Sequence, residues 1–376
     1  MEQGGERRLD FVDGLRACAI LPVILFHTWC NSAVLWRSHF WSPAALGAHG
    51  VELFFVISGF CLSYPTLRKV ASGERYALPY RAFIARRLVR ILPPFWIALA
   101  AFVVLSLTPI WHMIATHGVE ITSYSLSDIA KEVSLFDRGP LHNGSFWSLS
   151  VELRWYFVFP LALWLFVHAK RAFILLGLAA WMLYFQTRLS ALDVEVLPAF
   201  LMGIIAADAF VRRAAWTRWA PHAFLCCVAI VLVWPGEPGA RTPIWQLTSF
   251  AFVLSAVGFT PMQRVLSWKP LAAIGVASYS IYLVHEPFIV WLDALNSPGL
   301  VTIAAALGVG ALFWLLVERP LTKPEVRRRM VAFTEDLLHL AMHITGPELL
   351  AILVRRGRRE KLASLPTAQG ARPERA

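Results

Sequence analysis

The chain of 376 residues is 57% hydrophobic and only 16% charged, with a mean hydropathy of +0.58. Soluble domains carry about a quarter charged residues, and here the apolar residues gather in blocks of about 17–25, long enough to cross a bilayer. This excludes a soluble protein and predicts an all-α, polytopic bundle of membrane helices in contact with the lipid bilayer. The formal net charge of +11 would suggest nucleic acid binding in a soluble protein. Basic cytoplasmic loops account for that charge in a membrane protein, so we exclude nucleic acid as a partner.

The apolar pattern predicts ten helices that cross the membrane. Their expected ranges are residues 11–30, 47–64, 92–113, 148–167, 173–185, 196–211, 223–234, 244–259, 271–292 and 300–317. Several of these ranges are short, which is typical of tilted or buried helices in a bundle. The first range lacks a small-residue cleavage site, so we expect a retained span and not a cleaved signal peptide.

The basic residues predict how these helices are oriented. Arginine and lysine gather between residues 68 and 90 and again after residues 169, 211, 263 and 318, whereas the alternate loops carry scattered charges. Because basic loops face the cytoplasm, we expect both termini to be cytoplasmic. Residues 1–320 then form the transmembrane domain. Residues 321–376 form a basic cytoplasmic tail, with an amphipathic helix near residues 331–353 and a disordered end.

The cysteines give no sign of a metal site. All five lie in or beside apolar segments, and their spacing does not match a set of metal ligands. We therefore expect free thiols that pack as small hydrophobic residues, and no bound metal.

Two ionisable residues lie inside the first predicted helix. Arg16 and His27 are eleven residues apart, which places both on one helix face, about 16 Å apart along the axis. Ionisable groups at membrane depth are costly and therefore mark candidate functional sites. With an ordinary pKa of about 6.5, a histidine accepts a proton at physiological pH. The alternative is that Arg16 reaches to the membrane surface and that His27 is a packing residue.

The second predicted helix begins with the sequence GVELFFVISGF at residues 50–60. Glu52 lies at its outer end, where it would pair with His27 or with an outer arginine. Ser58 lies mid-helix beside Gly59, and small residues at such positions permit close helix packing. We take Glu52 and Ser58 as candidate substrate contacts, with structural roles as the alternative.

A run of arginines precedes the third predicted helix. Arg87 and Arg90 lie three residues apart and so share a helix face, and Arg86 neighbours Arg90 four residues away. Planar guanidinium groups bind phosphate through paired hydrogen bonds. We expect these arginines to bind phosphates at the cytoplasmic surface, with ordinary charge anchoring as the alternative.

The sequence SFWSLSVELRWY at residues 145–156 opens the fourth predicted helix. Glu152 and Tyr156 lie four residues apart and face the same way. A glutamate at the mouth of a membrane helix, flanked by aromatic residues, indicates a site more than packing. We take Glu152 as a candidate catalytic residue and Trp147, Ser148 and Tyr156 as candidate substrate contacts.

The ninth predicted helix carries the sequence IGVASYSIYLVHEP at residues 274–287. Ser278, Tyr282 and His285 lie along one face, and His285 falls in the outer half. Tyr282 and His285 are therefore candidate substrate contacts. The alternative is a polar seam that joins helices, worth about 0.6–2 kcal/mol per hydrogen bond.

Taken in order, these blocks resemble the membrane-bound acyltransferase family 3. The resembling pieces are LDFVDGLR at residues 9–16 with His27, the block at 50–60, Arg87 with Arg90, the blocks at 147–156 and 278–287, and VERP at 317–320. Members of this family have ten core helices and move an acyl group, often acetyl, from cytoplasmic acyl-CoA to hydroxyls of glycans, lipids or small molecules. The family's arginine-ten-histidine motif falls on Arg16 and His27, and its arginine-two-arginine motif falls on Arg87 and Arg90.

The resemblance and the residues together predict an O-acetyltransferase domain over residues 1–320, in a bacterial plasma (inner) membrane. The donor would be acetyl-CoA, and the acceptor a hydroxyl of a cell-envelope polysaccharide, a glycolipid or a related molecule. His27 would act as general base or would transiently take the acyl group, and Arg16 would orient the donor or stabilise negative charge on the thioester oxygen. Arg86, Arg87 and Arg90 would bind coenzyme A. Glu152 would orient His27 or the acceptor.

The sequence differs from the family pattern in two respects, and one other class of membrane protein is an alternative. In some members of the family an arginine stands just before the segment that corresponds to residues 197–203. This chain has no arginine there, so we expect no substrate contact from that position. No hydrolase-like domain follows the last predicted helix, so a separate periplasmic or extracellular transferase would complete delivery where one is needed. The rival is a secondary transporter or an acyl-group translocator, but such folds often show matched broken helices in two halves. We find no such repeat, and acyl transfer from acetyl-CoA would discriminate between the two classes.

Overall fold

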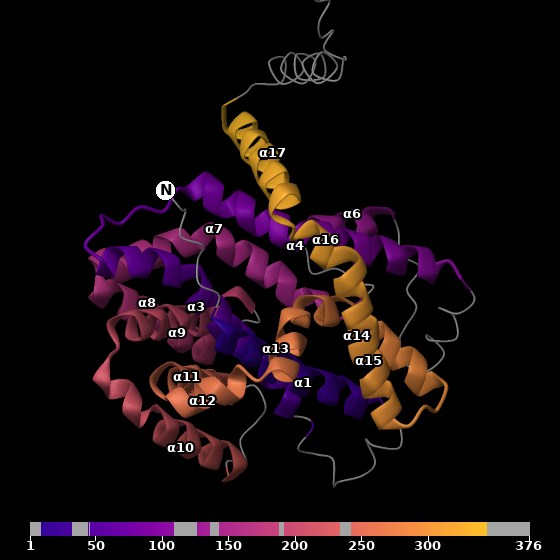
Figure 1. Ribbon diagram of the computed structural model, residues 1–376, viewed down its shortest axis with the longest axis horizontal. Coiled ribbons are helices and arrows are strands. Elements are labelled where there is room, and N and C mark those ends of the chain that lie inside the picture. Colours follow the sequence, from indigo (N-terminus) through magenta and orange to yellow (C-terminus); the bar gives the residue numbers. More distant parts are fainter. Residues whose placement is uncertain are drawn as a thin grey trace, which may run out of the picture.

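The computed structural model describes residues 9–31, 44, 46–108, 126–135, 143–187, 192–233 and 242–343. Every regular element within these ranges is a helix, and the helices form one bundle (Figure 1), which confirms the all-α fold. The longer helices are α1 (Asp10–Asn31), α3 (Gly50–Ala71), α4 (Tyr80–Ser106), α7 (Phe146–His168), α8 (Lys170–Thr187), α9 (Leu192–Arg212), α10 (Ala220–Val233), α11 (Thr242–Gly258), α14 (Ser278–Ala294), α15 (Gly299–Phe313) and α17 (Pro324–His343). The shorter ones are α6 (Leu126–Ser134), η2 (Ala215–Trp219), α12 (Thr260–Leu266), α13 (Lys269–Val276), η4 (Trp314–Glu318) and α16 (Arg319–Leu321).

The described helices support a polytopic membrane protein. Seven helices are long and apolar enough to cross a membrane, and two bent helix pairs raise the number to as many as nine within the described ranges. The expected fifth span, residues 173–185, coincides with α8, which is not among these nine. The total of ten spans and the cytoplasmic position of both termini therefore remain predictions.

Two helix pairs in the second half of the chain are sharply bent, and one of the bends interrupts an expected span. Helix α11 meets α12 at 103°, and α13 meets α14 at 71°. Both α12 and α13 carry a proline within their first two positions, where proline suits a helix start but cannot continue a preceding helix. The prediction of one continuous helix over residues 271–292 is wrong, because the helix breaks at Ala277, between α13 and α14.

The break brings α13 against the first helix. A Cβ added to Gly275 on α13 would overlap the backbone of Asp13 on α1, so only glycine permits this approach. Helix α1 is thereby fixed one turn before Arg16, the first candidate functional residue along the chain.

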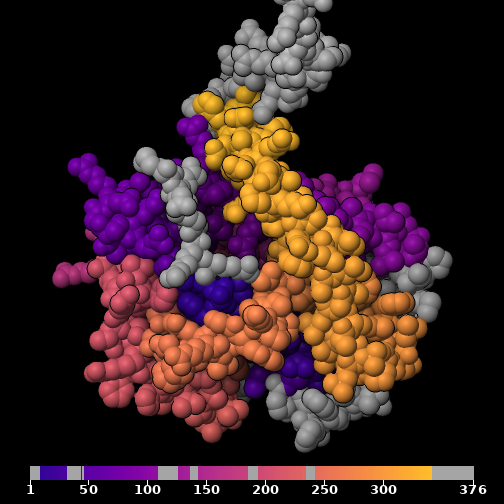
Figure 2. Space-filling view, in the orientation of Figure 1, coloured from indigo at the N-terminus to yellow at the C-terminus, as the bar shows by residue number. Residues whose placement is uncertain are grey.

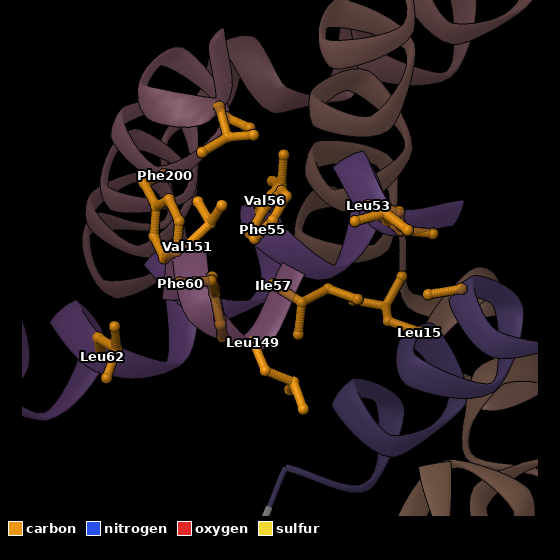
Figure 3. Close-up of a cluster of buried hydrophobic side chains, with 14 of the residues drawn as sticks. Leu15, Leu53, Phe55, Val56, Ile57, Phe60, Leu62, Leu149, Val151 and Phe200 are labelled. Carbon is orange, nitrogen blue, oxygen red and sulfur yellow. The ribbon is translucent and has the colours of Figure 1, made fainter. Parts of the chain in front are cut away.

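The centre of the bundle lies around α3 and α9. A Cβ on Gly203 of α9 would overlap the carbonyl oxygen of Val56 on α3, so small residues allow these two helices to touch, as packing in membranes requires. Figure 3 shows the buried side chains that gather around this contact, among them Phe55, Phe60 and Phe200. These contacts position the part of α3 that carries Ser58 and Cys61.

Helix α4 begins earlier than the hydropathy pattern predicts. The expected span starts at residue 92, whereas α4 starts at Tyr80, directly after Pro79. Arginine, leucine and alanine are good helix formers, so the basic stretch continues the helix although it lowers the hydropathy. Arg87 and Arg90 consequently lie two turns inside α4 and not at its edge.

Helix α17 overlaps the expected amphipathic helix at residues 331–353. It begins at Pro324 and rises above the bundle beside α4 (Figure 1), with a 2.8 Å hydrogen bond between Arg81 and His339. The expected disordered end lies outside the described residues.

Candidate active site

A large cavity, here called the vestibule, lies between α1, α3, α4 and the helices η4, α16 and α17. It encloses about 530 Å³, within the range of about 300–1,000 Å³ typical of small-molecule sites. In Figure 2 the surface is hollowed beside the yellow ridge of α16 and α17. The lining residues are Leu9, Val12, Asp13, Arg16, Phe60, Cys61, Tyr64, Pro65, Val89, Arg90, Pro94, Val276, Trp314, Glu318, Leu321, Thr322 and Arg327.

A second, smaller cavity of about 80 Å³, here called the inner cavity, lies deeper in the bundle. Side chains of α1, α3, α4, α7 and α14 enclose it. The lining residues are Arg16, Val51, Phe54, Phe55, Ile57, Ser58, Cys61, Leu62, Arg87, Arg90, Ile91, Ser148, Leu149, Glu152, Tyr156, Ser278, Tyr279 and Tyr282. Five expected site residues on α3, α7 and α14 thus converge on one space: Ser58, Ser148, Glu152, Tyr156 and Tyr282.

The vestibule and the inner cavity meet at three residues. Arg16, Cys61 and Arg90 line both cavities. Arg16 is held there because its Nη1 donates to Asp13 Oδ1 at 2.9 Å and its Nη2 donates to Cys61 Sγ at 3.5 Å. The junction between the cavities therefore carries two guanidinium groups, which favour a negatively charged ligand. Sequence analysis predicted only a packing role for Cys61, because a lone cysteine in an apolar helix is typical of a small buried residue.

Arg87 and Arg90 both face the inner cavity, on the shared helix face that their spacing predicts. Neither forms an ion pair with a carboxylate within the described ranges, and the Nε of Arg87 is buried without a hydrogen-bond partner. Arg87 lies 5.7 Å from the ring centre of Phe83, so a cation–π contact supports its guanidinium. Arg86, the third expected donor contact, lines neither cavity.

Glu152 lies in the wall of the same cavity as these arginines. Its Oε1 accepts hydrogen bonds from Ser58 at 2.9 Å and from Tyr156 at 2.6 Å. The i, i+4 pairing of Glu152 with Tyr156 agrees with the sequence. The structure does not bring Glu152 to His27, so the expected role of orienting that histidine has no support in the geometry.

The partner of His27 is His285. His27 Nδ1 and His285 Nε2 are 2.8 Å apart, and their ring centres are 4.9 Å apart. His285 is fully buried, whereas His27 is half-buried. His285 Nδ1 lies 2.9 Å from the carbonyl oxygen of Tyr282 and 3.1 Å from that of Ile281. Sequence reasoning singled out both histidines, but a contact between α1 and α14 depends on tertiary structure.

Tyr282 connects the histidine pair to the inner cavity. Its ring lines the cavity and lies 5.6 Å from the ring of His285. Its hydroxyl donates to the carbonyl oxygen of Ser145 at 2.7 Å and lies 2.6 Å from the hydroxyl of Ser148. These bonds fix Tyr282 against the first turn of α7. The neighbouring Trp147 is half-buried and lines neither cavity.

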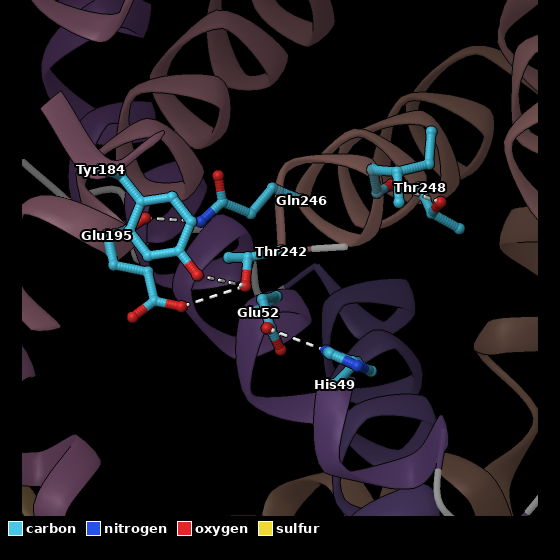
Figure 4. Close-up of polar contacts among 8 residues, drawn as sticks. His49, Glu52, Tyr184, Glu195, Thr242, Gln246 and Thr248 are labelled. Atoms are coloured by element: carbon cyan, nitrogen blue, oxygen red, sulfur yellow. Dashed lines mark hydrogen bonds and ion pairs between the residues drawn. The ribbon is translucent and has the colours of Figure 1, made fainter. Parts of the chain in front are cut away.

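Glu52 belongs to a separate polar cluster formed by α3, α9 and α11. It pairs with His49 at 3.0 Å, and not with His27 or an arginine as the sequence suggested. His49 in turn stacks on Trp245 with ring centres 4.4 Å apart. Nearby, Thr242 donates to Glu195 at 3.0 Å (Figure 4). The three-residue spacing of His49 and Glu52 in the sequence could have indicated their pairing.

Besides Cys61, sequence analysis did not single out two further vestibule residues, Glu318 and Arg327. Glu318 in η4 accepts a 2.5 Å hydrogen bond from Ser280 on α14 and faces the vestibule. The η4 segment is a π-helical turn, a feature found frequently at functional sites. Arg327, in the first turns of α17, adds a third guanidinium to the vestibule beside Arg16 and Arg90. Sequence analysis could not distinguish Arg327 from the other arginines of the tail, because the excess of basic residues in cytoplasmic segments explains all of them equally well.

Comparison with known proteins assigns the chain to a family. The family described as "Acyltransferase domain" matches residues 9–318, which include both cavities up to Glu318 and the histidine pair. The chain belongs to this family. The assignment confirms the resemblance seen in the sequence and shows that the chain carries a membrane acyltransferase domain.

Three relatives in the acyltransferase family illustrate the similarity. "Putative peptidoglycan O-acetyltransferase YrhL" of Bacillus subtilis is 25% identical, over 76% of this chain and 49% of its own length. "Putative membrane-bound transacylase BcsY" of Komagataeibacter xylinus is 28% identical, over 83% of this chain and 82% of its own length. "Peptidoglycan O-acetyltransferase OatA" of Listeria monocytogenes is 25% identical, over 83% of this chain and 55% of its own length. The chain therefore spans about half the length of YrhL and OatA. No solved structure matches this acyltransferase chain.

Proposed function

We propose that the protein is a membrane O-acetyltransferase that uses cytoplasmic acetyl-CoA to acylate a hydroxyl of a cell-envelope polysaccharide, a glycolipid or a related acceptor. The observation that carries this proposal is the junction of the vestibule and the inner cavity at Arg16 and Arg90. A polyanionic donor needs a cationic, roomy entrance followed by a narrow channel for its reactive arm. The two cavities have this form.

The vestibule would hold the nucleotide part of coenzyme A. Arg16, Arg90 and Arg327 line it, and Arg87 lies just beyond the junction in the inner cavity. A charge-assisted bond between guanidinium and phosphate is worth about 1.5–3 kcal/mol. The tail helix α17, which carries Arg327, would thus become part of the donor site.

The thioester arm would extend through the inner cavity toward Tyr282. There the acceptor oxygen attacks the thioester carbonyl, the C–O bond forms and the C–S bond breaks. His27 takes the hydroxyl proton as general base, and the coenzyme A thiolate leaves and is protonated. In the variant with an acyl-histidine intermediate, a ring nitrogen of His27 attacks first and the acceptor oxygen then displaces it.

The acceptor would approach His27 from the side of the membrane opposite the vestibule. The names of YrhL and OatA refer to acetylation of peptidoglycan, which supports a cell-envelope glycan and hence the plasma (inner) membrane of a bacterium. Glu52 and Trp147 remain candidate contacts for such an acceptor, although neither lines the described cavities. A separate periplasmic or extracellular transferase would complete delivery where the acceptor lies beyond reach.

The alternative of a secondary transporter is not favoured by membership of an acyltransferase family. The test is the reaction of purified protein, reconstituted in sealed lipid vesicles, with acetyl-CoA labelled in the acetyl group. The proposal predicts loss of thioester and recovery of label in an alkali-labile ester on an added glycan acceptor. Movement of label across a vesicle membrane without thioester cleavage would instead indicate transport.

A further inference from the structure

The hydrogen-bond partners of His285 determine where its protons lie. A backbone carbonyl oxygen only accepts hydrogen bonds. Because His285 Nδ1 lies 2.9 Å from the Tyr282 oxygen and 3.1 Å from the Ile281 oxygen, Nδ1 must carry a proton. A neutral His285 then has its lone pair on Nε2, which points at His27.

A protonated His285 would place a cation in a fully buried site. Burial of an unpaired charge is costly, and among the described ion pairs none joins His285 to the adjacent carboxylate, Glu286, which points instead at Ser145. Its Oε2 accepts from the backbone N–H and from the hydroxyl of Ser145, each at 2.6 Å. The neutral form of His285 therefore fits its surroundings.

At 2.8 Å, His27 Nδ1 and His285 Nε2 lie at hydrogen-bond distance, so one of these two nitrogens must carry a proton. With a lone pair on His285 Nε2, the 2.8 Å contact is a hydrogen bond only if His27 Nδ1 donates. We infer that His285 is the positioning residue that keeps His27 in the tautomer with its proton on Nδ1 and its lone pair on Nε2. The lone pair then points away from His285 and is available to a reacting group.

Hydrogen bonds to the neighbouring part of α14 keep the acceptor, His285 Nε2, in place. Pro287 has no N–H to donate to the carbonyl oxygen of Leu283, and Asn143 Nδ2 donates to that oxygen instead, at 2.8 Å. Tyr282, one turn before His285, is tied to Ser145 and Ser148. The positioning group is thus anchored to α7 on two sides.

The chemical consequence resembles the role of the buried carboxylate in serine hydrolases, where an acceptor on the Nδ1 side holds the base in its productive tautomer. Here the acceptor is a second, neutral histidine, whose own orientation is set by backbone carbonyls. The meaning for catalysis rests on the proposed transfer at His27. The tautomer itself does not depend on that proposal.

The test is solid-state NMR of protein labelled with ¹⁵N-histidine in lipid bilayers. The resonances of His27 are assigned by difference against His27→Gln, and a protonated ring nitrogen is distinguished from an unprotonated one by its chemical shift. We expect His27 with Nδ1 protonated and Nε2 unprotonated in the unmodified protein. A His27 signal with Nε2 protonated would overturn the inference without any variant at position 285.

Variants at position 285 then link the tautomer to the reaction. His285→Leu, which offers no acceptor, should shift His27 toward the Nε2-protonated form and lower kcat by about a hundredfold, with KM for acetyl-CoA nearly unchanged. His285→Gln retains an acceptor oxygen and should restore both the tautomer and a large part of kcat. His222→Leu, which removes an exposed histidine, is the matched control and should change neither.

Two outcomes separate this inference from the proposed function. An unchanged His27 tautomer in His285→Leu would reject the positioning role. Absence of transfer from acetyl-CoA in the unmodified protein would reject the proposed function, while the NMR result would still decide the tautomer.

Discussion

Ser58 on α3 donates a 2.9 Å hydrogen bond to Glu152 on α7, although the two residues lie 94 positions apart in the chain. The same carboxylate oxygen accepts a 2.6 Å bond from Tyr156. Two hydroxyls therefore hold one carboxylate in the cavity wall that also contains Arg87 and Arg90. One carboxylate thus shares the inner cavity with these two guanidinium groups.

A first prediction concerns the charge of Glu152. Glu152→Gln keeps the shape and can still accept from both hydroxyls, so only the charge is lost. We expect kcat to fall by about ten- to a hundredfold, because charge-assisted interactions in a dry site are worth about 1.5–3 kcal/mol. Steady-state kinetics on protein purified at matched amounts would measure this. Ser58→Ala, which removes one hydrogen bond, should cost only about fivefold. Full activity of Glu152→Gln would show that the charge has no role.

A second prediction concerns Arg87 and Arg90. Replacement of both by alanine should weaken coenzyme A binding by at least about tenfold, since about 1.4 kcal/mol is one decade in affinity. Lysine replacements should recover only part of the affinity, because a point charge cannot reproduce the planar fork. Isothermal titration with coenzyme A would measure both effects. Arg86→Ala is the matched control, since Arg86 lines neither cavity. An equal loss of coenzyme A affinity in Arg86→Ala would indicate that all three arginines only anchor the protein at the cytoplasmic membrane surface.

A third prediction concerns the tail helix. Arg327 lines the vestibule, whereas Arg329, on the same helix and also exposed, does not. Arg327→Ala should therefore weaken coenzyme A binding by about tenfold, at a cost of about 1.5 kcal/mol. Arg329→Ala should leave it unchanged. Binding of dephospho-coenzyme A would show whether Arg327 contacts the 3′-phosphate, since its affinity should then be insensitive to the substitution. Identical behaviour of the two variants would exclude α17 from the donor site.

A fourth prediction concerns the packing of α3 on α9. Gly203→Val places a side chain against the carbonyl oxygen of Val56, and such overpacking costs roughly 1–3 kcal/mol of folding free energy. We expect a clear drop in Tm by thermal fluorescence. Gly308 on α15 has no atom within 4 Å of an added Cβ, so Gly308→Ala should be neutral or slightly stabilising. A Gly203→Val protein as stable as the unmodified one would mean that the helices pack more loosely than described.

The sequence predicted the individual polar residues better than their partners. Ionisable groups in apolar helices are costly, and this principle alone selected Arg16, His27 and Glu152. The contact of His27 with His285 was inaccessible, because it depends on how α14 bends away from α13 and returns to α1. The Thr-Pro and Lys-Pro pairs mark where α12 and α13 begin, and a hydropathy average registers neither these starts nor the break at Ala277 between α13 and α14.

The start of the helix that carries the arginines was predicted too late for a related reason. Hydropathy placed this start at residue 92, after Arg87 and Arg90. Helix propensity, which arginine satisfies well, carries α4 back to Tyr80 and turns both side chains into the inner cavity. Nothing in the sequence marked Cys61 or Arg327 as a site residue, because a packing role accounts for the cysteine and the basic cytoplasmic tail accounts for the arginine.

In the proposed function, donor binding and chemistry occur at separate places on one path. A comparison of coenzyme A binding and acetyl transfer in His27→Ala and in the double variant Arg87→Ala/Arg90→Ala tests this separation. We expect His27→Ala to accumulate in the membrane, to bind coenzyme A with nearly normal affinity and to transfer no acetyl group. The arginine variant should lose affinity and retain residual transfer at saturating acetyl-CoA. Loss of coenzyme A affinity in His27→Ala with normal affinity in the arginine variant would contradict a donor site separate from the catalytic histidine.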